Sequence, residues 1–298
     1  MSATLHLVVT LVLCTALVSP LARARWVWRS PRVGILLWQM LALTWVLCAV
    51  GSAFAVWLSL YDPNLPTALG RWLDGGQRRA EPTVGHVVLL SFGVALAVAL
   101  TAALAGSWVG VLRVRRRHRN MLTLVAREDD AVPGVLVLDH PLTVAYCLPG
   151  LRARVVLSSG ALETLGEREL AAVVAHERAH ARERHDLVLL PFAALRRLFP
   201  KDQMVTAAAE AVALLVEMRA DEHACRTVGA GSLATALHRF SVLEVPPPRG
   251  AIGMVDGAVA ARLSRLTRTA TPLPLWACGL VMATGMVLLS TPLSFLVL

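Results

Sequence analysis

Four long stretches of this 298-residue chain contain no Asp, Glu, Lys or Arg, and they constrain its fold more than any other feature. A helix needs about 20 apolar residues to cross a hydrocarbon core of about 30 Å. Each stretch is long enough, and a soluble protein of this size rarely buries four such helices. We therefore predict a polytopic α-helical membrane protein with four transmembrane helices, at about 3–22, 33–60, 84–112 and 269–298. Pro292 is expected to interrupt the end of the fourth.

The composition supports a membrane protein and argues against other classes. Hydrophobic residues make up 56% of the chain and charged residues 16%, where a typical globular chain has about 25% charged residues. The net charge is +9, but the arginines gather beside the apolar stretches, where membrane orientation and anionic headgroups explain them. No zinc-finger spacing accompanies them, so no nucleic-acid partner is expected. The five cysteines form no Cys-x-x-Cys pair, which argues against a disulfide framework.

The loop charges predict the orientation in the cell membrane. The first loop has no acidic residue and four arginines, which are Arg23, Arg25, Arg29 and Arg32. The segment after the third stretch begins with another basic run, over residues 113–119. Because positive residues near span ends stay inside, both segments are predicted to be cytoplasmic and both termini external. These arginines follow the first apolar run instead of preceding it, which indicates an uncleaved helix and not a signal peptide.

This pattern divides the chain into a membrane region at 1–112, a cytoplasmic domain at 113–268 and the fourth helix at 269–298. The first third of the cytoplasmic domain predicts a small antiparallel sheet. Three short runs rich in β-branched residues are separated by Pro and Gly turns. The runs are 135–138, 143–147 and 154–157, and the turns are Pro133-Gly134, Asp139-His140-Pro141 and Pro149-Gly150.

Helical patterns follow the strands. The segment Ser158-Ser159-Gly160 can cap a short helix that runs through Leu165, and Gly166 breaks this helix. A longer helix is predicted over residues 167–184, with acidic residues at its start and basic residues near its end, as the helix dipole prefers. A second long helix is predicted over 207–228, and Pro246-Pro247-Pro248 ends the next helical piece. The domain is therefore expected to be of the α+β class.

The first long helix carries the motif His176-Glu177-Arg178-Ala179-His180. Histidines at positions i and i+4 project from the same helix face, so their imidazoles can bind one Zn²⁺ ion. The alternative is that both histidines are solvated, since Arg178 and Arg182 are charged. However, residues 171–175 are apolar and would bury the first half of the helix. A buried histidine pair without partners is costly, and this favours the metal site.

A catalytic zinc ion usually has a third protein ligand and one open position. Glu183 and Asp186 stand where one class of metallopeptidases has Gly and a third His, so that arrangement is excluded. Glu217 is the best candidate, because Asp221 lies one turn later and can accept a hydrogen bond from a ligand imidazole. The competing candidates are Glu210, Glu222 and His223.

These parts predict a hydrolytic mechanism. Zinc lowers the pKa of its bound water toward about 7 and polarises a scissile carbonyl. Glu177 would take the proton of that water and pass it to the leaving amine. A strand edge could hold the peptide in an extended conformation. The oxyanion-stabilising residue stays open among Tyr146, His238 and Arg262. His185 is expected on the side of the helix opposite His176, at the surface or at an interface.

The chain resembles the BlaR/MecR-type membrane metallopeptidases, and more widely the HtpX and CAAX-prenyl-protease zincins. The residues that carry the resemblance are 148–150, 154–158, 169–180, 186–187 and 217–221. It implies a zincin-like domain in which His176, His180 and Glu217 bind zinc. It also implies that Glu177 is the catalytic base and that Asp221 orients a ligand. We expect no extracellular penicillin-binding domain after the fourth helix, and therefore no direct acylation by a β-lactam.

By this resemblance, the substrate would be a cytoplasmic protein, often a transcriptional repressor, cut after an external signal. Three functions stay open: a regulatory or processing endopeptidase, a quality-control protease for membrane proteins, and a non-catalytic signalling protein with structural zinc. Glu177 argues against the third, because a structural zinc site needs no general base. The oligomeric state and the activating signal are left open.

Overall fold

The computed structural model describes residues 3–128, 135–148, 154–243, 252–268 and 271–297. The predicted turns at Pro133-Gly134 and Pro149-Gly150 lie outside these residues, as does the predicted helix end at Pro246-Pro247-Pro248. The chain forms two compact units. The first contains Met1–Gly106, Phe192–Ala211 and Leu273–Leu298, and the second contains Ser107–Pro191 and Val212–Pro272.

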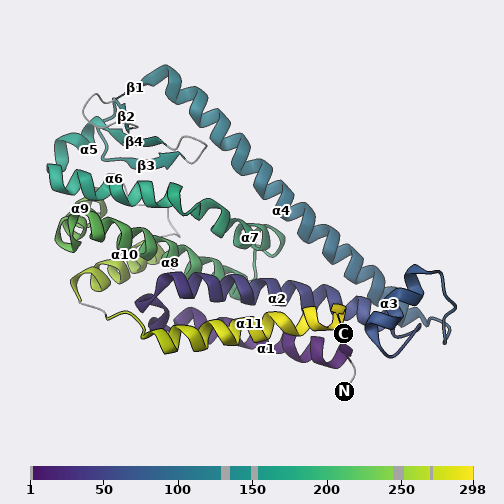
Figure 1. The fold of residues 1–298 in the computed structure, drawn as a ribbon. Helices are drawn as coiled ribbons and strands as arrows, with labels where there is room; N and C mark the ends of the chain where they lie inside the picture. The colour runs from purple at the N-terminus through teal and green to yellow at the C-terminus, as the bar shows by residue number, and fades with distance from the viewer. Residues whose placement is uncertain (1–2, 129–134, 149–153, 244–251, 269–270, 298) are drawn as a thin grey trace. The chain divides into compact units, whose positions relative to one another are not determined.

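The first unit is built from long apolar helices (Figure 1). Its elements are α1 (Ala3–Arg23), η1 (Arg25–Arg29), α2 (Pro31–Leu58), α3 (Leu65–Leu73), the first part of α4 (Val84–Val125) and α11 (Leu275–Val297). Four segments are long and apolar enough to cross a membrane: Ala3–Arg23, Pro31–Leu58, Val84–Leu122 and Leu275–Ser294. They correspond to the four predicted stretches. Pro292 lies inside α11, which continues to Val297, so the predicted interruption is wrong.

Helices α1, α2 and α11 lie side by side (Figure 1). Leu7 of α1 packs against Cys48 and Ala55 of α2 in a buried cluster. Gly285 of α11 leaves room for the side chain of Met40 on α2, because a Cβ atom at position 285 would lie 2.4 Å from Cε of Met40. Small residues at such crossings let apolar helices pack closely.

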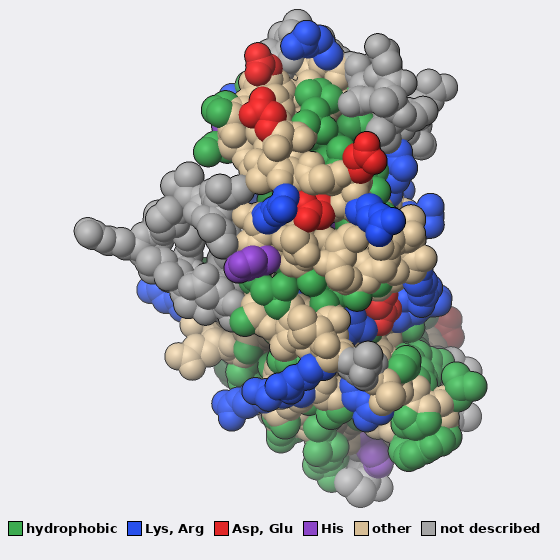
Figure 2. All heavy atoms as spheres, turned by 90° about the vertical axis from the view of Figure 1, so that its left-hand side faces the viewer, with side chains coloured by type: hydrophobic (Ala, Val, Ile, Leu, Met, Phe, Trp, Pro, Cys, Tyr) green, Lys and Arg blue, Asp and Glu red, His purple; other side chains and the backbone are tan. Residues whose placement is uncertain are grey.

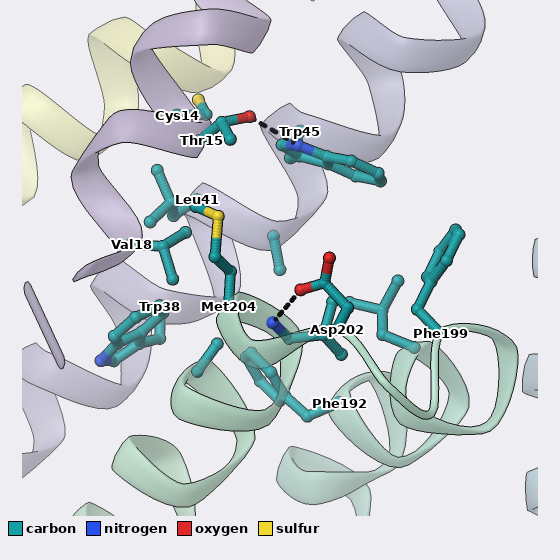
Figure 3. A pocket seen from close by; sticks show the side chains of 14 residues that line it. Cys14, Thr15, Val18, Trp38, Leu41, Trp45, Phe192, Phe199, Asp202 and Met204 are labelled. Carbon is teal, nitrogen blue, oxygen red and sulfur yellow. Dashed lines mark hydrogen bonds between the residues drawn. The ribbon is translucent and has the colours of Figure 1, made fainter.

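The end of α7 (His185–Leu198) and the start of α8 (Gln203–Val228) also belong to this unit. With α1 and α2 they surround a cavity of about 160 Å³ (Figure 3). Trp38, Phe192 and Phe199 contribute to its mostly apolar lining. Asp202 caps α8 by accepting a hydrogen bond from the N–H of Val205 at 2.8 Å, so α8 starts four residues before the predicted Ala207.

The second unit contains a four-stranded sheet in the order β1-β2-β4-β3. The strands are β1 (Ala126–Glu128), β2 (Val135–Leu138), β3 (Ala145–Leu148) and β4 (Arg154–Ser158). The three predicted strands are confirmed, but the wholly antiparallel sheet is wrong, because β2 and β4 are parallel. β3 pairs with the outer side of β4 and not with β2, so the two central strands run in the same direction.

Both faces of this sheet are covered within the unit. Val155 and Leu157 of β4 pack against Val173 and Val174 of α6 (Glu167–Arg182). Val156, which points to the opposite face, packs against Leu122 near the end of α4. Alternate residues of a strand face opposite sides, so one short strand anchors helices on both.

The remaining helices are α5 (Ser159–Thr164), α9 (Ala230–Leu243) and α10 (Ile252–Thr267). The predicted cap of α5 is confirmed, because Oγ of Ser158 accepts a hydrogen bond from the N–H of Ala161 at 3.1 Å. α6 ends two residues before the predicted Arg184, because that residue has a φ of 52°.

Acidic and basic side chains are interspersed over the upper part of the face in Figure 2.

Candidate metal centre

Three side chains of the second unit bring possible metal ligands together. His176 and His180 lie one turn apart on α6, and their Nε2 atoms are separated by 3.1 Å. Glu217 of α8 places Oε2 3.3 Å from Nε2 of His176 and Oε1 3.5 Å from Nε2 of His180. Of the residues that the structure describes, these three form the one group with metal-binding geometry.

The spacing of these atoms fits a tetrahedral zinc site. Zinc–nitrogen bonds of about 2.0–2.1 Å place tetrahedral ligand atoms about 3.3–3.4 Å apart. The three separations of 3.1, 3.3 and 3.5 Å surround this value. Two imidazoles and one carboxylate also form a donor set that catalytic zinc uses, and they leave one tetrahedral position for a water or a substrate.

Asp221 lies beside Nδ1 of His176, on the side of the ring away from Glu217, as its spacing from Glu217 predicts. Its Oδ1 is 3.0 Å from Nδ1 of His176, although this contact is not aligned as a hydrogen bond. Asp221 is 1% exposed. A buried carboxylate at this position can fix the orientation and tautomer of a ligand histidine.

Arg262 of α10 supplies the positive charge beside these carboxylates. Its Nη2 and Nε donate to the two oxygens of Asp221 at 2.7 and 2.9 Å. Its Nη1 lies 3.0 Å from Oε2 of Glu217. Burial raises the pKa of Glu217, but the hydrogen bond from His176 and the charge of Arg262 outweigh this and hold that pKa at about 2. The carboxylate is therefore ionised, as a metal ligand must be.

The two histidines have different proton affinities. Burial lowers the pKa of His176, but the adjacent carboxylates of Asp221 and Glu217 outweigh burial and raise it to about 9. Burial is the main reason why the pKa of His180 falls to about 4. Since a ligand nitrogen must be deprotonated, metal binding would release a proton mainly from His176.

Glu177 lies on α6 between the two histidines and faces strand β3. Its carboxylate accepts a hydrogen bond from the backbone N–H of Cys147. Burial raises the pKa of Glu177 to about 7, and the charge of His176 opposes this shift. A carboxylate that gains and loses a proton near neutral pH is suited to general acid and base catalysis.

His185 is buried beside His180, and the predicted surface position is wrong. It is 2% exposed, and its Nδ1 lies 3.0 Å from Nδ1 of His180. The prediction continued α6 through residue 184, but the chain turns at Arg184 and His185 begins α7. No periodic pattern in the sequence signals this change of direction.

The other candidates for the third ligand either pair with different residues or lie outside the group of three possible ligands. Glu222 pairs with Arg219 and Arg265, and His223 pairs with Glu183 at 2.6 Å. Glu210 is not part of the three-residue group. Within the described residues, the structure therefore favours Glu217 over the alternatives that the sequence left open.

Of the three oxyanion candidates, Arg262 lies against the group. Tyr146 lies on β3, and its hydroxyl is 2.7 Å from Nε2 of His118. His238 lies on α9. Sequence spacing gave no reason to pair Arg262 with Asp221, because the two residues are 41 positions apart.

Residues 112–212 match the family model described as peptidase family M48. The match includes His176, Glu177 and His180 and ends before Glu217. This part of the chain is therefore similar to the peptidases of family M48. The narrower resemblance to BlaR/MecR or HtpX proteins stays a prediction. No solved structure matches the chain.

Proposed function

We propose that this chain is a membrane-bound, zinc-dependent endopeptidase of the gluzincin type that cuts a cytoplasmic or membrane-adjacent protein. The observation that carries this proposal is the convergence of His176, His180 and Glu217, with Glu177 on the same helix as the two histidines. A site that only stabilises the fold needs no such carboxylate. The match to a peptidase family supports the same reaction.

Each side chain of the site would have its own role in the reaction. His176, His180 and Glu217 would hold the ion, and Asp221 and Arg262 would keep His176 and Glu217 in place. When bound there, zinc lowers the pKa of a water toward about 7 and polarises the scissile carbonyl. Glu177 accepts the proton of the attacking water and delivers it to the leaving amine. The backbone N–H of Cys147 favours the ionised form of Glu177, which is the form that accepts this proton.

The sheet offers a place for the substrate backbone. β3 is the last strand of the order β1-β2-β4-β3, so one of its edges has no neighbouring strand among the described residues. The N–H of Cys147 on this strand points to Glu177. An extended peptide that pairs with this edge would therefore pass beside the general base. Backbone pairing would hold many sequences, so side chains near the scissile bond would set specificity.

The membrane part suggests where the substrate lies. The arginines after the first and third apolar helices favour a cytoplasmic catalytic unit and external termini. A substrate would then be a cytoplasmic protein or the cytoplasmic part of a membrane protein. The resemblance to sensor-type metallopeptidases favours regulated proteolysis in signalling, with a transcriptional repressor as the substrate. Broad quality-control proteolysis is the second candidate, because the edge of β3 can bind peptides through their backbone alone.

A comparison of protein N-termini in cells tests the proposal. One culture expresses the chain and another expresses Glu177→Gln, which keeps the ligand set but removes the base. The exposed Glu167 on the same helix provides the control variant Glu167→Gln. We expect one or a few new termini with the wild type and the control. Loss of a general base lowers the rate by about 10²–10⁴-fold, so Glu177→Gln should not produce these termini.

The number of new termini separates the candidate functions. A few indicate selective, regulatory cleavage, and many from damaged membrane proteins indicate quality control. If no terminus depends on Glu177, with or without membrane stress, the endopeptidase proposal fails. The non-catalytic function with a structural zinc ion would then be favoured.

A further inference from the structure

His180 has a partner on the side of its ring that faces away from the ligand group. Its Nε2 lies near His176 and Glu217, while its Nδ1 lies 3.0 Å from Nδ1 of His185. The two rings are nearly perpendicular, at 85°, with centroids 4.8 Å apart. His185 is 2% exposed. Its contact with His180 is therefore shielded from solvent.

His185 is held in turn by Glu183. Nε2 of His185 lies 3.4 Å from Oε2 of Glu183. The carboxylate of Glu183 also accepts hydrogen bonds from α8: Nη2 of Arg219 lies 2.7 Å and Nε2 of His223 2.6 Å from its Oε1. Arg219 and His223 thus hold the carboxylate of Glu183 in place. This carboxylate faces Nε2 of His185, on the side of the ring away from His180.

The hydrogen-bond donors and acceptors in the series Glu183, His185 and His180 can be assigned from the groups themselves. An ionised carboxylate can only accept, so the proton of neutral His185 is placed on Nε2, which faces Glu183. Nδ1 of His185 then carries a lone pair and can only accept. The proton between the two rings consequently belongs to Nδ1 of His180. His180 is left with a lone pair on Nε2, which is the atom that faces His176 and Glu217.

We propose that His185 is a positioning residue for the metal centre and that it holds His180 in the tautomer that binds zinc through Nε2. This inference rests on the proposed function, because it assigns a role within the same zinc site. The two ligand histidines are held differently: His176 faces the carboxylate of Asp221, and His180 faces a neutral ring that relays the charge of Glu183. Mutation of a residue that hydrogen-bonds to the other ring nitrogen of a ligand histidine typically lowers metal affinity by about 10- to 100-fold.

The turn between α6 and α7 brings His185 into contact with His180. Arg184 has a φ of 52°, in the left-handed region, which ends α6 and brings the next residue back toward it. His185 is thereby placed against a residue five positions earlier. On a continuous helix, residues five positions apart would lie on different faces and would not meet.

The test uses the full-length chain in detergent and measures Zn²⁺ affinity by competition with a chromophoric chelator. His185→Phe keeps a ring of similar shape but has no acceptor. His185→Asn restores an acceptor oxygen near the place of Nδ1. His86→Phe, at the start of α4, controls for the loss of a histidine elsewhere. Circular dichroism of the metal-free proteins checks folding, and His185→Leu replaces the Phe variant if that one is misfolded.

We expect His185→Phe to bind Zn²⁺ about 10- to 100-fold more weakly than the wild type, and His185→Asn to recover most of this loss. The visible absorption of bound Co²⁺ should change in the Phe variant and not in His86→Phe. Equal affinity of the Phe variant and the wild type would overturn the proposal, as would an Asn variant that is as weak as Phe. A wild-type chain that binds no zinc would instead refute the proposed function itself.

Discussion

Arg262 of α10 binds both carboxylate oxygens of Asp221 on α8, with Nη2 and Nε at 2.7 and 2.9 Å. The same guanidinium lies 3.0 Å from Glu217. Asp221 is 1% exposed, so water cannot replace this partner. One arginine thus contacts two carboxylates, of which one is a proposed zinc ligand and the other faces a proposed ligand histidine.

Arg262→Met should destabilise the metal-free protein. It leaves the carboxylate of Asp221 buried without its counter-charge, and removing one partner of a buried pair costs about 3 kcal/mol. We expect a lower midpoint of thermal unfolding, measured by the loss of helical circular dichroism. The exposed Arg268 near the end of α10 provides the control Arg268→Gln. An unchanged midpoint in Arg262→Met would show that the pair contributes nothing to stability.

The left-handed conformation of Arg184 should tolerate glycine but not a β-branched residue. A non-glycine residue in this region costs about 1–2 kcal/mol, and valine is strained there more than arginine. Glycine relieves this strain but loses more backbone entropy on folding, so we expect Arg184→Gly to be at least as stable as the wild type. We expect Arg184→Val to be less stable by about 1 kcal/mol or more. Thermal unfolding of the two variants checks this. Equal midpoints would contradict the conformation at this turn.

The proposed orientation in the membrane can be tested separately from catalysis. Reporters that are active only in the cytoplasm are fused after residue 30 and after residue 130 of the chain. The basic residues near both sites predict cytoplasmic signals from each. A third reporter in the loop between Tyr61 and Pro82 should be inactive, because this loop is predicted to be external. An expressed but inactive reporter at either of the first two sites would refute the proposed topology.

Much of the candidate site could be predicted from the sequence because its members repeat at helical spacing. His176 and His180 lie one turn apart, as do Glu217 and Asp221, so each pair shares a helix face. Two such faces with complementary ligand types suffice to predict one metal site. The structure brings His176, His180 and Glu217 together in that way.

Other features depend on contacts that no local pattern encodes. Arg262 meets Asp221 through the packing of α10 on α8, 41 positions away in the chain. The burial of His185 depends on a single residue with positive φ at position 184. The parallel pairing of β2 and β4 depends on which side of β4 the strand β3 joins. The strand patterns predicted the strands themselves but not their neighbours.

The most direct test of the account is the zinc content of the purified full-length chain and of two glutamate variants. Glu217→Ala removes the proposed third ligand, and Glu210→Ala removes a glutamate seven residues earlier on the same helix. We expect about one zinc ion per chain in the wild type and in Glu210→Ala, and little or none in Glu217→Ala. Stoichiometric zinc in a folded Glu217→Ala protein would contradict it, as would a wild-type chain without zinc.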